Sequence, residues 1–267
     1  MDQEQGWMSV VALNLQHRPG KSQSWSEGPS SQDLSSDRVD VWRVHLDEPS
    51  LTLSTSSVLS PDELNRAGRF HFAKDRLHFT RCRSALRFVL SRYIGIPAAE
   101  IRFDYGPGGK PELAEQQNAR QLRFNVSHSA GLALIAVSAE HRLGIDIEKT
   151  RADVDITTLA ERFFSTRERA GLRALPDHLR VSGFFACWTR KESFLKATGE
   201  GLSFPLADFS VTTHPDLDPA IEEIRGNTEA RKQWFLADLS VINGYRATVA
   251  VEGVYSRLEA YTLSCIS

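Results

Sequence analysis

Two short segments of the chain carry the residue types that phosphoryl chemistry requires. Asp146 and Glu148 alternate with isoleucines, and about forty residues later Trp188, Glu192 and Lys196 recur at every fourth position. Alternation of apolar and acidic residues predicts a strand with both acids on one face, and the four-residue spacing predicts a helix that carries its three side chains along one stripe. Together the two segments supply three carboxylates and an ammonium group.

These acids fit magnesium better than zinc. No histidine or cysteine stands near them at zinc-ligand spacing, and Mg²⁺ prefers oxygen ligands while keeping sites for water and substrate phosphates. The pattern therefore indicates a phosphorylated substrate. The structural alternative is a solvated strand edge at Asp146 and Glu148, with Glu192 and Lys196 forming a surface ion pair of a few tenths of a kcal/mol.

Two further motifs lie between the start of the chain and the acids. The four motifs are Gly109-Lys110-Pro111, Phe124-Asn125-Val126-Ser127-His128-Ser129, Gly144-Ile145-Asp146-Ile147-Glu148 and Trp188-Thr189-Arg190-Lys191-Glu192-Ser193-Phe194-Leu195-Lys196. In this order and spacing they resemble the Sfp-type 4′-phosphopantetheinyl transferases, which move the phosphopantetheine arm of coenzyme A onto a serine of a carrier protein. The resemblance extends from about residue 60 to about residue 206.

The sequence pattern and the resemblance agree on the fold class. Helices and strands alternate unevenly, with hairpins dominant, which indicates an α+β fold. The resemblance implies two similar α+β halves in a pseudo-dimer with the active site in the cleft between them, although the sequence shows no strong internal repeat. We expect a disordered tail over residues 1–38, an N-terminal half over 39–140 and a C-terminal half over 141–267.

The last two motifs carry the candidate metal ligands, the candidate base and the candidate contact to the leaving group. Asp146, Glu148 and Glu192 are expected to bind Mg²⁺, although Asp146 could bind through water. Glu192 is also the candidate general base, acting directly or through a metal-bound water. Lys196 is expected to reach the pyrophosphate and stabilise the departing adenosine 3′,5′-bisphosphate.

The coenzyme A contacts are carried over from the resemblance as well. They comprise Lys110, Asn125, Ser127 and His128, with Arg66 at the position of a basic residue that meets the 3′-phosphate in relatives. Each has a structural alternative, because glycine-rich turns, turn-capping serines and solvated helix ends need no ligand.

One basic contact differs from the relatives. Position 63, where some relatives carry a lysine, is Glu63 here. The contact is expected to be missing, or to be supplied by Arg69 or Lys74.

Two other classes of function stay open at this point. A non-catalytic module that binds coenzyme A or a carrier protein would keep Lys110 and His128 but has no need for three acids. A Mg²⁺-dependent phosphohydrolase would need the acids but no docking surface for a protein acceptor.

Composition agrees with a cytoplasmic, monomeric enzyme. The chain has 267 residues, 41% of them hydrophobic, and a net charge of −2, which argues against bulk binding to nucleic acid or to an anionic membrane. Its three cysteines, Cys82, Cys187 and Cys265, are far apart and favour a reducing compartment. We expect no secretory signal or membrane span.

The remaining pattern predicts the elements that position the motifs. Residues 60–63 read as a capped helix start, and 132–138 and 143–148 as a hairpin centred near Glu140 that places Glu148 across from Ala133. We further expect helices over 74–93, 156–175 and 179–198, and strands over 39–44, 100–105, 122–126, 207–213, 234–240, 245–252 and 258–264.

Overall fold

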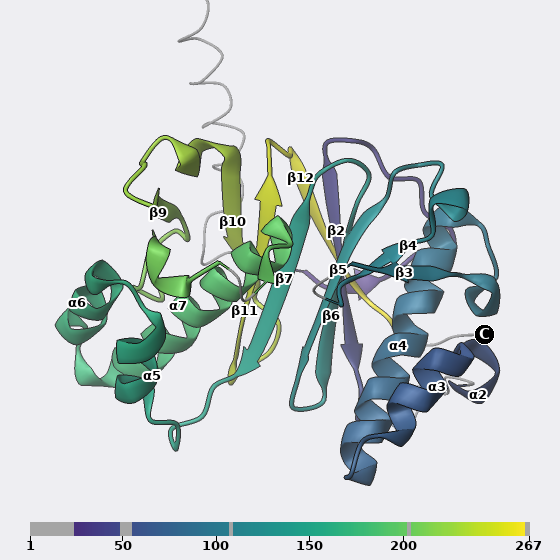
Figure 1. Cartoon of the computed structure of the whole chain (residues 1–267), viewed down its shortest axis with the longest axis horizontal. Coiled ribbons are helices and arrows are strands. Elements are labelled where there is room, and N and C mark those ends of the chain that lie inside the picture. Colours follow the sequence, from purple (N-terminus) through teal and green to yellow (C-terminus); the bar gives the residue numbers. More distant parts are fainter. Residues whose placement is uncertain (1–23, 49–54, 107–108, 202–203, 265–267) are drawn as a thin grey trace, which may run out of the picture.

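The fold has the expected α+β class. The computed structural model describes residues 24–48, 55–106, 109–201 and 204–264 (Figure 1). A five-stranded sheet in the order β1-β12-β2-β6-β5 and a three-stranded sheet in the order β10-β11-β7 form its centre. No helix in the described ranges is long and apolar enough to cross a membrane.

The two halves of the chain repeat one topology. The first half contains β2 (Arg38–His45), α2 (Thr55–Val58), α3 (Pro61–Gly68), α4 (Ala73–Ile94), β3 (Phe103–Tyr105), β4 (Pro111–Leu113), β5 (Arg123–Ser129) and β6 (Leu132–Ser138). The second half contains β7 (Leu143–Lys149), α5 (Ile156–Phe163), α6 (Thr166–Ala174), α7 (Asp177–Thr198), β8 (Phe209–Val211), β9 (Ile221–Ile224), β10 (Trp234–Asp238) and β11 (Tyr245–Glu252). Short 3₁₀ turns lie at Ala98–Glu100, Glu115–Gln117, Leu206–Asp208 and Ala230–Gln233.

Each half thus runs from a strand through short helices to a 22-residue helix, a two-stranded sheet and a hairpin. The first strand of each half pairs antiparallel with the last, β2 with β6 and β7 with β11. The pseudo-dimer expected from the resemblance is therefore confirmed, although the repeat is visible in topology and not in sequence.

The two halves also share a buried ion pair at the same place. The short helix directly before the long one, α3 in the first half and α6 in the second, begins with a capping box, whose glutamates are Glu63 and Glu168. The Glu63 carboxylate binds Arg83 at 2.6 Å and Arg87 at 2.7 Å on α4, and Glu168 binds Lys191 at 2.7 Å on α7. Glu63 is therefore a buried, paired residue, and it also lines the cavity that contains Arg66.

The hairpin predicted for residues 132–138 and 143–148 is wrong. β6 pairs with β5 through a turn at Ala130 and Gly131 and with β2 on its other side, so both of its edges are filled. β7 consequently joins the second sheet, where Glu148 lies opposite Arg246 and not opposite Ala133. The other predicted helices and strands are present, but the helix expected over 156–175 is divided into α5 and α6, and the strands expected over 100–105 and 207–213 are reduced to β3 and β8.

The part of the N-terminal segment that the structure describes does not form the expected tail. Residues 1–23 of the expected tail lie outside the described residues, whereas the chain is ordered against the body from residue 24. β1 (Ser26–Glu27) pairs with β12 (Arg257–Thr262), and the Trp25 indole donates to the Ser240 carbonyl at 2.7 Å. β12 itself lies beside β2, so the end of the second half completes the first sheet.

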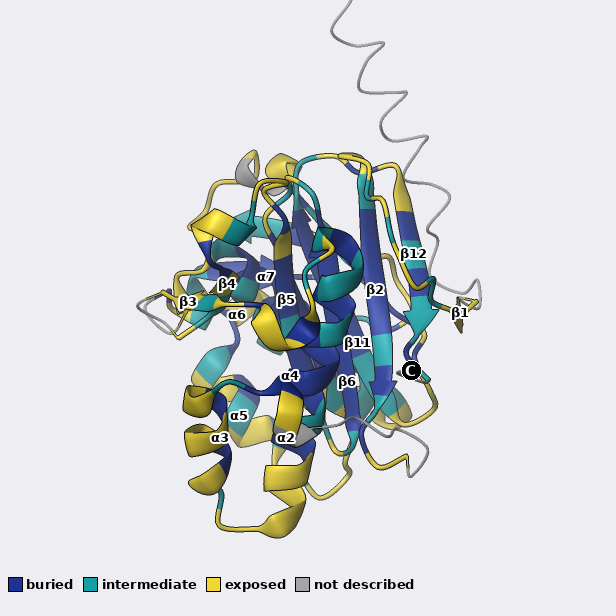
Figure 2. Ribbon diagram, turned by 90° about the vertical axis from the view of Figure 1, so that its right-hand side faces the viewer, coloured by how far each residue is buried: buried dark blue, intermediate teal, exposed yellow. Residues whose placement is uncertain are grey.

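The two sheets share a core between them. Figure 2 shows buried residues concentrated along β2, β6 and β11, with exposed ones on α3. Ile145 and Ile147 of β7 are 0% exposed and pack in one cluster with Val41 and Leu134 of the first sheet. The acids that alternate with these isoleucines must therefore face the other way, toward α7, as the alternation predicts.

Candidate active site

Gly144 sets the distance between the strand and the helix that carry the motifs. A Cβ atom there would lie 2.2 Å from the Ser193 carbonyl oxygen and 2.4 Å from the Ala197 amide nitrogen. These are backbone atoms of α7, so only glycine lets the helix lie this close to β7. The last turns of α7 therefore cross next to Asp146.

Lys196 is bound directly to this acid. Its Nζ lies 2.6 Å from Asp146 Oδ1 and 3.0 Å from Ser127 Oγ, and the Ser127 hydroxyl donates to the same Asp146 oxygen at 3.0 Å. The three side chains come from α7, β7 and β5. A surface ion pair between Glu192 and Lys196 is thus not what the structure contains: the partner of Lys196 is Asp146 in the other motif.

Glu148 and Glu192 complete an acidic cluster. Burial raises the pKa of each of these carboxyl groups, and the negative charge of Asp146 raises both further. Lys196 acts in the opposite direction on both. Carboxylates that disfavour one another's ionisation in this way form a place where a cation is electrostatically favoured.

The residues fit a hard cation. Asp146 is 3% exposed, and its second oxygen, Oδ2, is buried without a hydrogen-bond partner in the described structure. An unsatisfied carboxylate oxygen in an all-oxygen donor set is suited to Mg²⁺. Within the described ranges no three His, Cys, Asp or Glu side chains form a ready-made metal-binding group.

Asn125 lies at the seam between the halves. Strands β5 and β7 are the facing edges of the two sheets, and the Asn125 side-chain oxygen accepts a hydrogen bond from the Ile145 backbone at 2.9 Å. β5 and β7 are joined by hydrogen bonds of side chains, and not by the backbone hydrogen bonds of a continuous sheet. Asn125 therefore aligns β7 and is not directed at an open site.

Lys110 also bridges the halves. Its Nζ donates to the Lys196 carbonyl at 2.7 Å and to the Leu143 carbonyl at 3.4 Å, next to the C-terminal end of α7. Burial lowers the pKa of Lys110 to about 8. The ammonium group thus lies behind Lys196 and helps to hold the last turn of α7.

His128 follows Ser127 and lies on the face of β5 that also carries Phe124 and Val126, and it is exposed at the end of that face. Partial desolvation lowers the pKa of its imidazole, and the positive charges of His78 and Lys196 lower it further. His78, on the first turns of α4, binds Asp47 at 2.7 Å. The start of α4 therefore lies close to His128.

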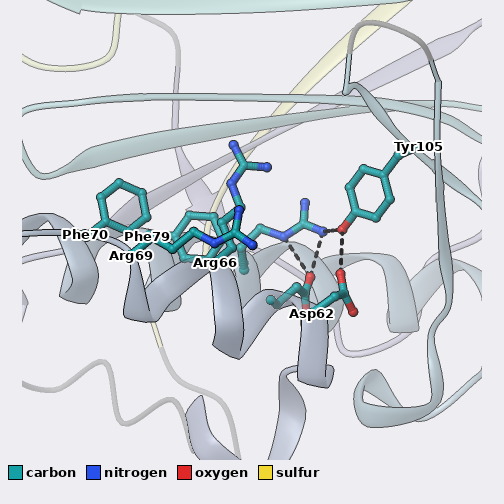
Figure 3. A pocket seen from close by; sticks show the side chains of 8 residues that line it. Asp62, Arg66, Arg69, Phe70, Phe79 and Tyr105 are labelled. Carbon is teal, nitrogen blue, oxygen red and sulfur yellow. Dashed lines mark hydrogen bonds and ion pairs between the residues drawn. The ribbon is translucent and has the colours of Figure 1, made fainter.

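Arg66 lines a separate cavity of about 530 Å³ between α3, α4 and β3 (Figure 3). Its guanidinium lies 5.4 Å from the centre of the Phe79 ring. Arg69 also lines the cavity, and the Arg83 guanidinium donates to the Tyr105 hydroxyl at 2.9 Å. Cations beside aromatic rings suit a phosphate joined to a flat base.

The sequence did not indicate two residues that contact the candidate site residues. Tyr105 lines the Arg66 cavity, and Ser129 donates to Glu148 Oε2 at 2.9 Å. The signal for Ser129 was present, because Asn125, Ser127 and Ser129 are two residues apart and share one face of β5. Nothing in the sequence marks Tyr105, whose contact depends on how β3 approaches α4.

The α+β halves and the acidic seam define a class of transferase, and comparison with known proteins identifies it. A model of the 4′-phosphopantetheinyl transferase superfamily matches residues 142–250, and a model of the N-terminal part of 4′-phosphopantetheinyl transferases matches residues 42–140.

Two relatives are similar over most of the chain. The 4′-phosphopantetheinyl transferase HetI of Nostoc sp. is 39% identical over 231 residues, which cover 86% of this chain and 94% of the relative. Sfp of Bacillus subtilis is 34% identical over 186 residues, covering 68% of this chain and 80% of that protein. The chain therefore belongs to the 4′-phosphopantetheinyl transferase family and is an enzyme.

Proposed function

We propose that this enzyme transfers the 4′-phosphopantetheine arm of coenzyme A to a serine of an acyl or peptidyl carrier protein, using Mg²⁺ held by Asp146, Glu148 and Glu192. The serine oxygen attacks the phosphorus joined to pantetheine, and the bond from that phosphorus to the bridging oxygen breaks. The products are the modified carrier and adenosine 3′,5′-bisphosphate. The observation that carries the proposal is the ion pair of Lys196 with the buried Asp146, beside Glu148 and Glu192, whose carboxyl groups both feel the charge of Asp146.

The acidic cluster supports the metal assignment. Asp146 Oδ2 is buried and unsatisfied, and two neighbouring carboxyl groups have raised pKa values. A bound Mg²⁺ would neutralise charge on the pyrophosphate. Among the three acids, Glu192 is the general base in this proposal, directly or through a metal-bound water, because it would lie next to the bound cation.

The cations of the seam support binding of coenzyme A. Lys196 would stabilise the departing bisphosphate, and Ser127 and His128 lie beside it. Lys110 would add positive charge from behind the last turn of α7. The Arg66 cavity is suited to the 3′-phosphate and the adenine, whereas Asn125 would act through the alignment of β7.

The finer context also belongs to the proposal. We assign the enzyme to the cytoplasm as a monomer that serves fatty acid, polyketide or nonribosomal peptide synthesis. The matched models divide the chain between residues 140 and 142, which supports a boundary between a 39–140 half and a 141–267 half.

One experiment separates this function from the two alternatives. A purified apo carrier protein is incubated with the enzyme, coenzyme A and Mg²⁺, and its mass is measured. A gain of the phosphopantetheine mass supports transfer. An unchanged carrier with intact coenzyme A points to a binding module, and an unchanged carrier with consumed coenzyme A points to a hydrolase.

A further inference from the structure

Ser129 donates a hydrogen bond to Glu148, and the proposed function gives this serine no role. Its hydroxyl donates to Glu148 Oε2 at 2.9 Å and accepts from the Lys149 backbone nitrogen at 3.2 Å. A hydrogen bond to a charged carboxylate is stronger and more directional than a neutral one. Ser129 therefore fixes both the carboxylate and the backbone that carries it.

The turn after Ser129 holds this serine in place. Ala130 and Gly131 have φ values of 43° and 88°, as a tight two-residue hairpin requires. The Tyr245 hydroxyl donates to the Ala130 carbonyl at 2.6 Å, and the Leu46 backbone donates to the Gly131 carbonyl at 2.7 Å. One anchor comes from each half of the molecule, so the position of Ser129 depends on both.

Gly131 shows how closely the anchors fit. A Cβ atom there would lie 2.2 Å from Asp47 Oδ2, and Asp47 is itself bound to His78 on α4. The hairpin tip thus contacts β11 and the residues that follow β2. A support of this kind is what a carboxylate needs when it must meet a ligand in one orientation.

We infer that Ser129 is a positioning residue that orients Glu148 for metal binding, supported by the β5–β6 turn. The inference rests on the proposed function, in which Glu148 is a metal ligand. Ser129 touches neither the metal nor the reacting atoms in this role. Its effect passes through the carboxylate, so it must appear in metal affinity before it appears anywhere else.

The test measures binding of Mn²⁺, a spectroscopic substitute for Mg²⁺, to the full chain in the presence of coenzyme A. Electron paramagnetic resonance of free Mn²⁺ gives the affinity without turnover. Ser129→Ala should weaken Mn²⁺ binding roughly tenfold, the lower range for loss of a residue that supports a metal ligand. Ser129→Thr keeps the hydroxyl on a strand residue and should stay within about twofold of the parent.

Ser138→Ala is the matched control. Ser138 lies on the neighbouring strand, is 0% exposed, and accepts from the His141 backbone at 3.3 Å, away from the acids. It should lower the unfolding temperature without changing Mn²⁺ affinity. Ser129→Ala should show the opposite result: weaker Mn²⁺ binding, with little change in the unfolding temperature.

Equal Mn²⁺ affinity of Ser129→Ala and the parent would overturn the inference, as would a threonine variant as weak as the alanine one. The parent enzyme is assayed for transfer in parallel. Transfer by the parent with unchanged binding in Ser129→Ala contradicts only the role of Ser129. A parent that neither binds Mn²⁺ nor modifies a carrier contradicts the proposed function instead.

Discussion

At the scale of single residues, mutation of Glu192 tests whether the acidic cluster is catalytic. Glu192→Gln removes both a metal ligand and the proposed base, so turnover should fall by on the order of 10²-fold or more. Folding should be retained because glutamine suits the same helix. Steady-state transfer to a carrier protein, with circular dichroism to verify folding, measures both effects.

Glu115→Gln is a suitable control for Glu192→Gln, because Glu115 is exposed and lies in a short turn of the first half. Its kinetics should match the parent. If folded Glu192→Gln also kept parental turnover, the general-base assignment would be wrong.

Lys110 predicts a pH dependence. Burial lowers its pKa to about 8; Arg142, Arg123 and Lys196 also lower it, whereas Glu112 raises it. The group loses its positive charge as pH rises through about 8, so the KM for coenzyme A should increase above that pH. Because only one proton is lost from Lys110, the increase is at most about tenfold per pH unit.

Lys110→Arg tests this reasoning, since a guanidinium stays charged over the whole range. Measured between about pH 7 and 9, the KM of this variant should show a flatter profile, whatever its absolute value. A parental KM that stayed constant across pH 8 would show that the charge of Lys110 does not contribute to coenzyme A binding.

At the scale of elements, the contact between β7 and α7 depends on one glycine. Gly144→Ala would press a methyl group against the backbone of Ser193 and Ala197, which cannot rotate away. We expect a loss of about 1–3 kcal/mol in the free energy of unfolding, typical of an overpacked core. Urea denaturation of the parent and the variant measures it.

Gly68→Ala provides the comparison, because a Cβ atom at Gly68 meets nothing within 4 Å. Its stability should equal or slightly exceed that of the parent, since alanine favours a helix. Equal stability of Gly144→Ala and the parent would mean that α7 and β7 do not need this close approach.

The N-terminal segment is an element that composition alone misjudges. Residues 24–38 lack an apolar period, which predicts a disordered tail. In the structure, however, Trp25 binds Ser240, Gln32 binds Asp40 at 3.1 Å, and Gly28 lies on the Trp42 ring. The absence of a periodic apolar pattern was misleading here. A segment that lies on the surface of the folded body is held by individual contacts, which need no regular spacing of apolar residues.

Deletion of residues 1–36 should therefore lower the thermal unfolding temperature by several degrees, roughly what a loss of 1–2 kcal/mol causes in a domain of this size. Deletion of residues 1–23 leaves every contact just described in place and serves as the reference. Two truncated proteins that unfold at the same temperature would show that residues 24–36 add no stability.

At the scale of the whole molecule, the sequence predicts the fold class but not the sheet pairing. Local signals are strong at Ser60 and Gly144, where capping and close approach are encoded by single residues. β7 cannot pair with β6 because β5 and β2 occupy both of its edges. The pairing with β2, about ninety residues earlier, is a long-range contact that spacing does not record.

The shared core also determines how the halves depend on each other. β12 belongs to the second half by sequence but completes the sheet of the first, and Ile145 packs with Val41 and Leu134. Separated fragments 24–140 and 141–267 would each expose one side of this core. Although each half repeats a complete topology, we expect neither fragment to unfold cooperatively alone, whereas the intact chain should show one transition.

Calorimetry and amide proton spectra of each fragment, and of their equimolar mixture, provide the measurement. The mixture should regain dispersed spectra if the seam and β12 suffice to join the halves. A 141–267 fragment with its own sharp unfolding transition would contradict this dependence. It would also mean that Glu168 with Lys191, together with the α7 contact at Gly144, stabilises the half that carries Asp146 and Glu192 without support from the first half.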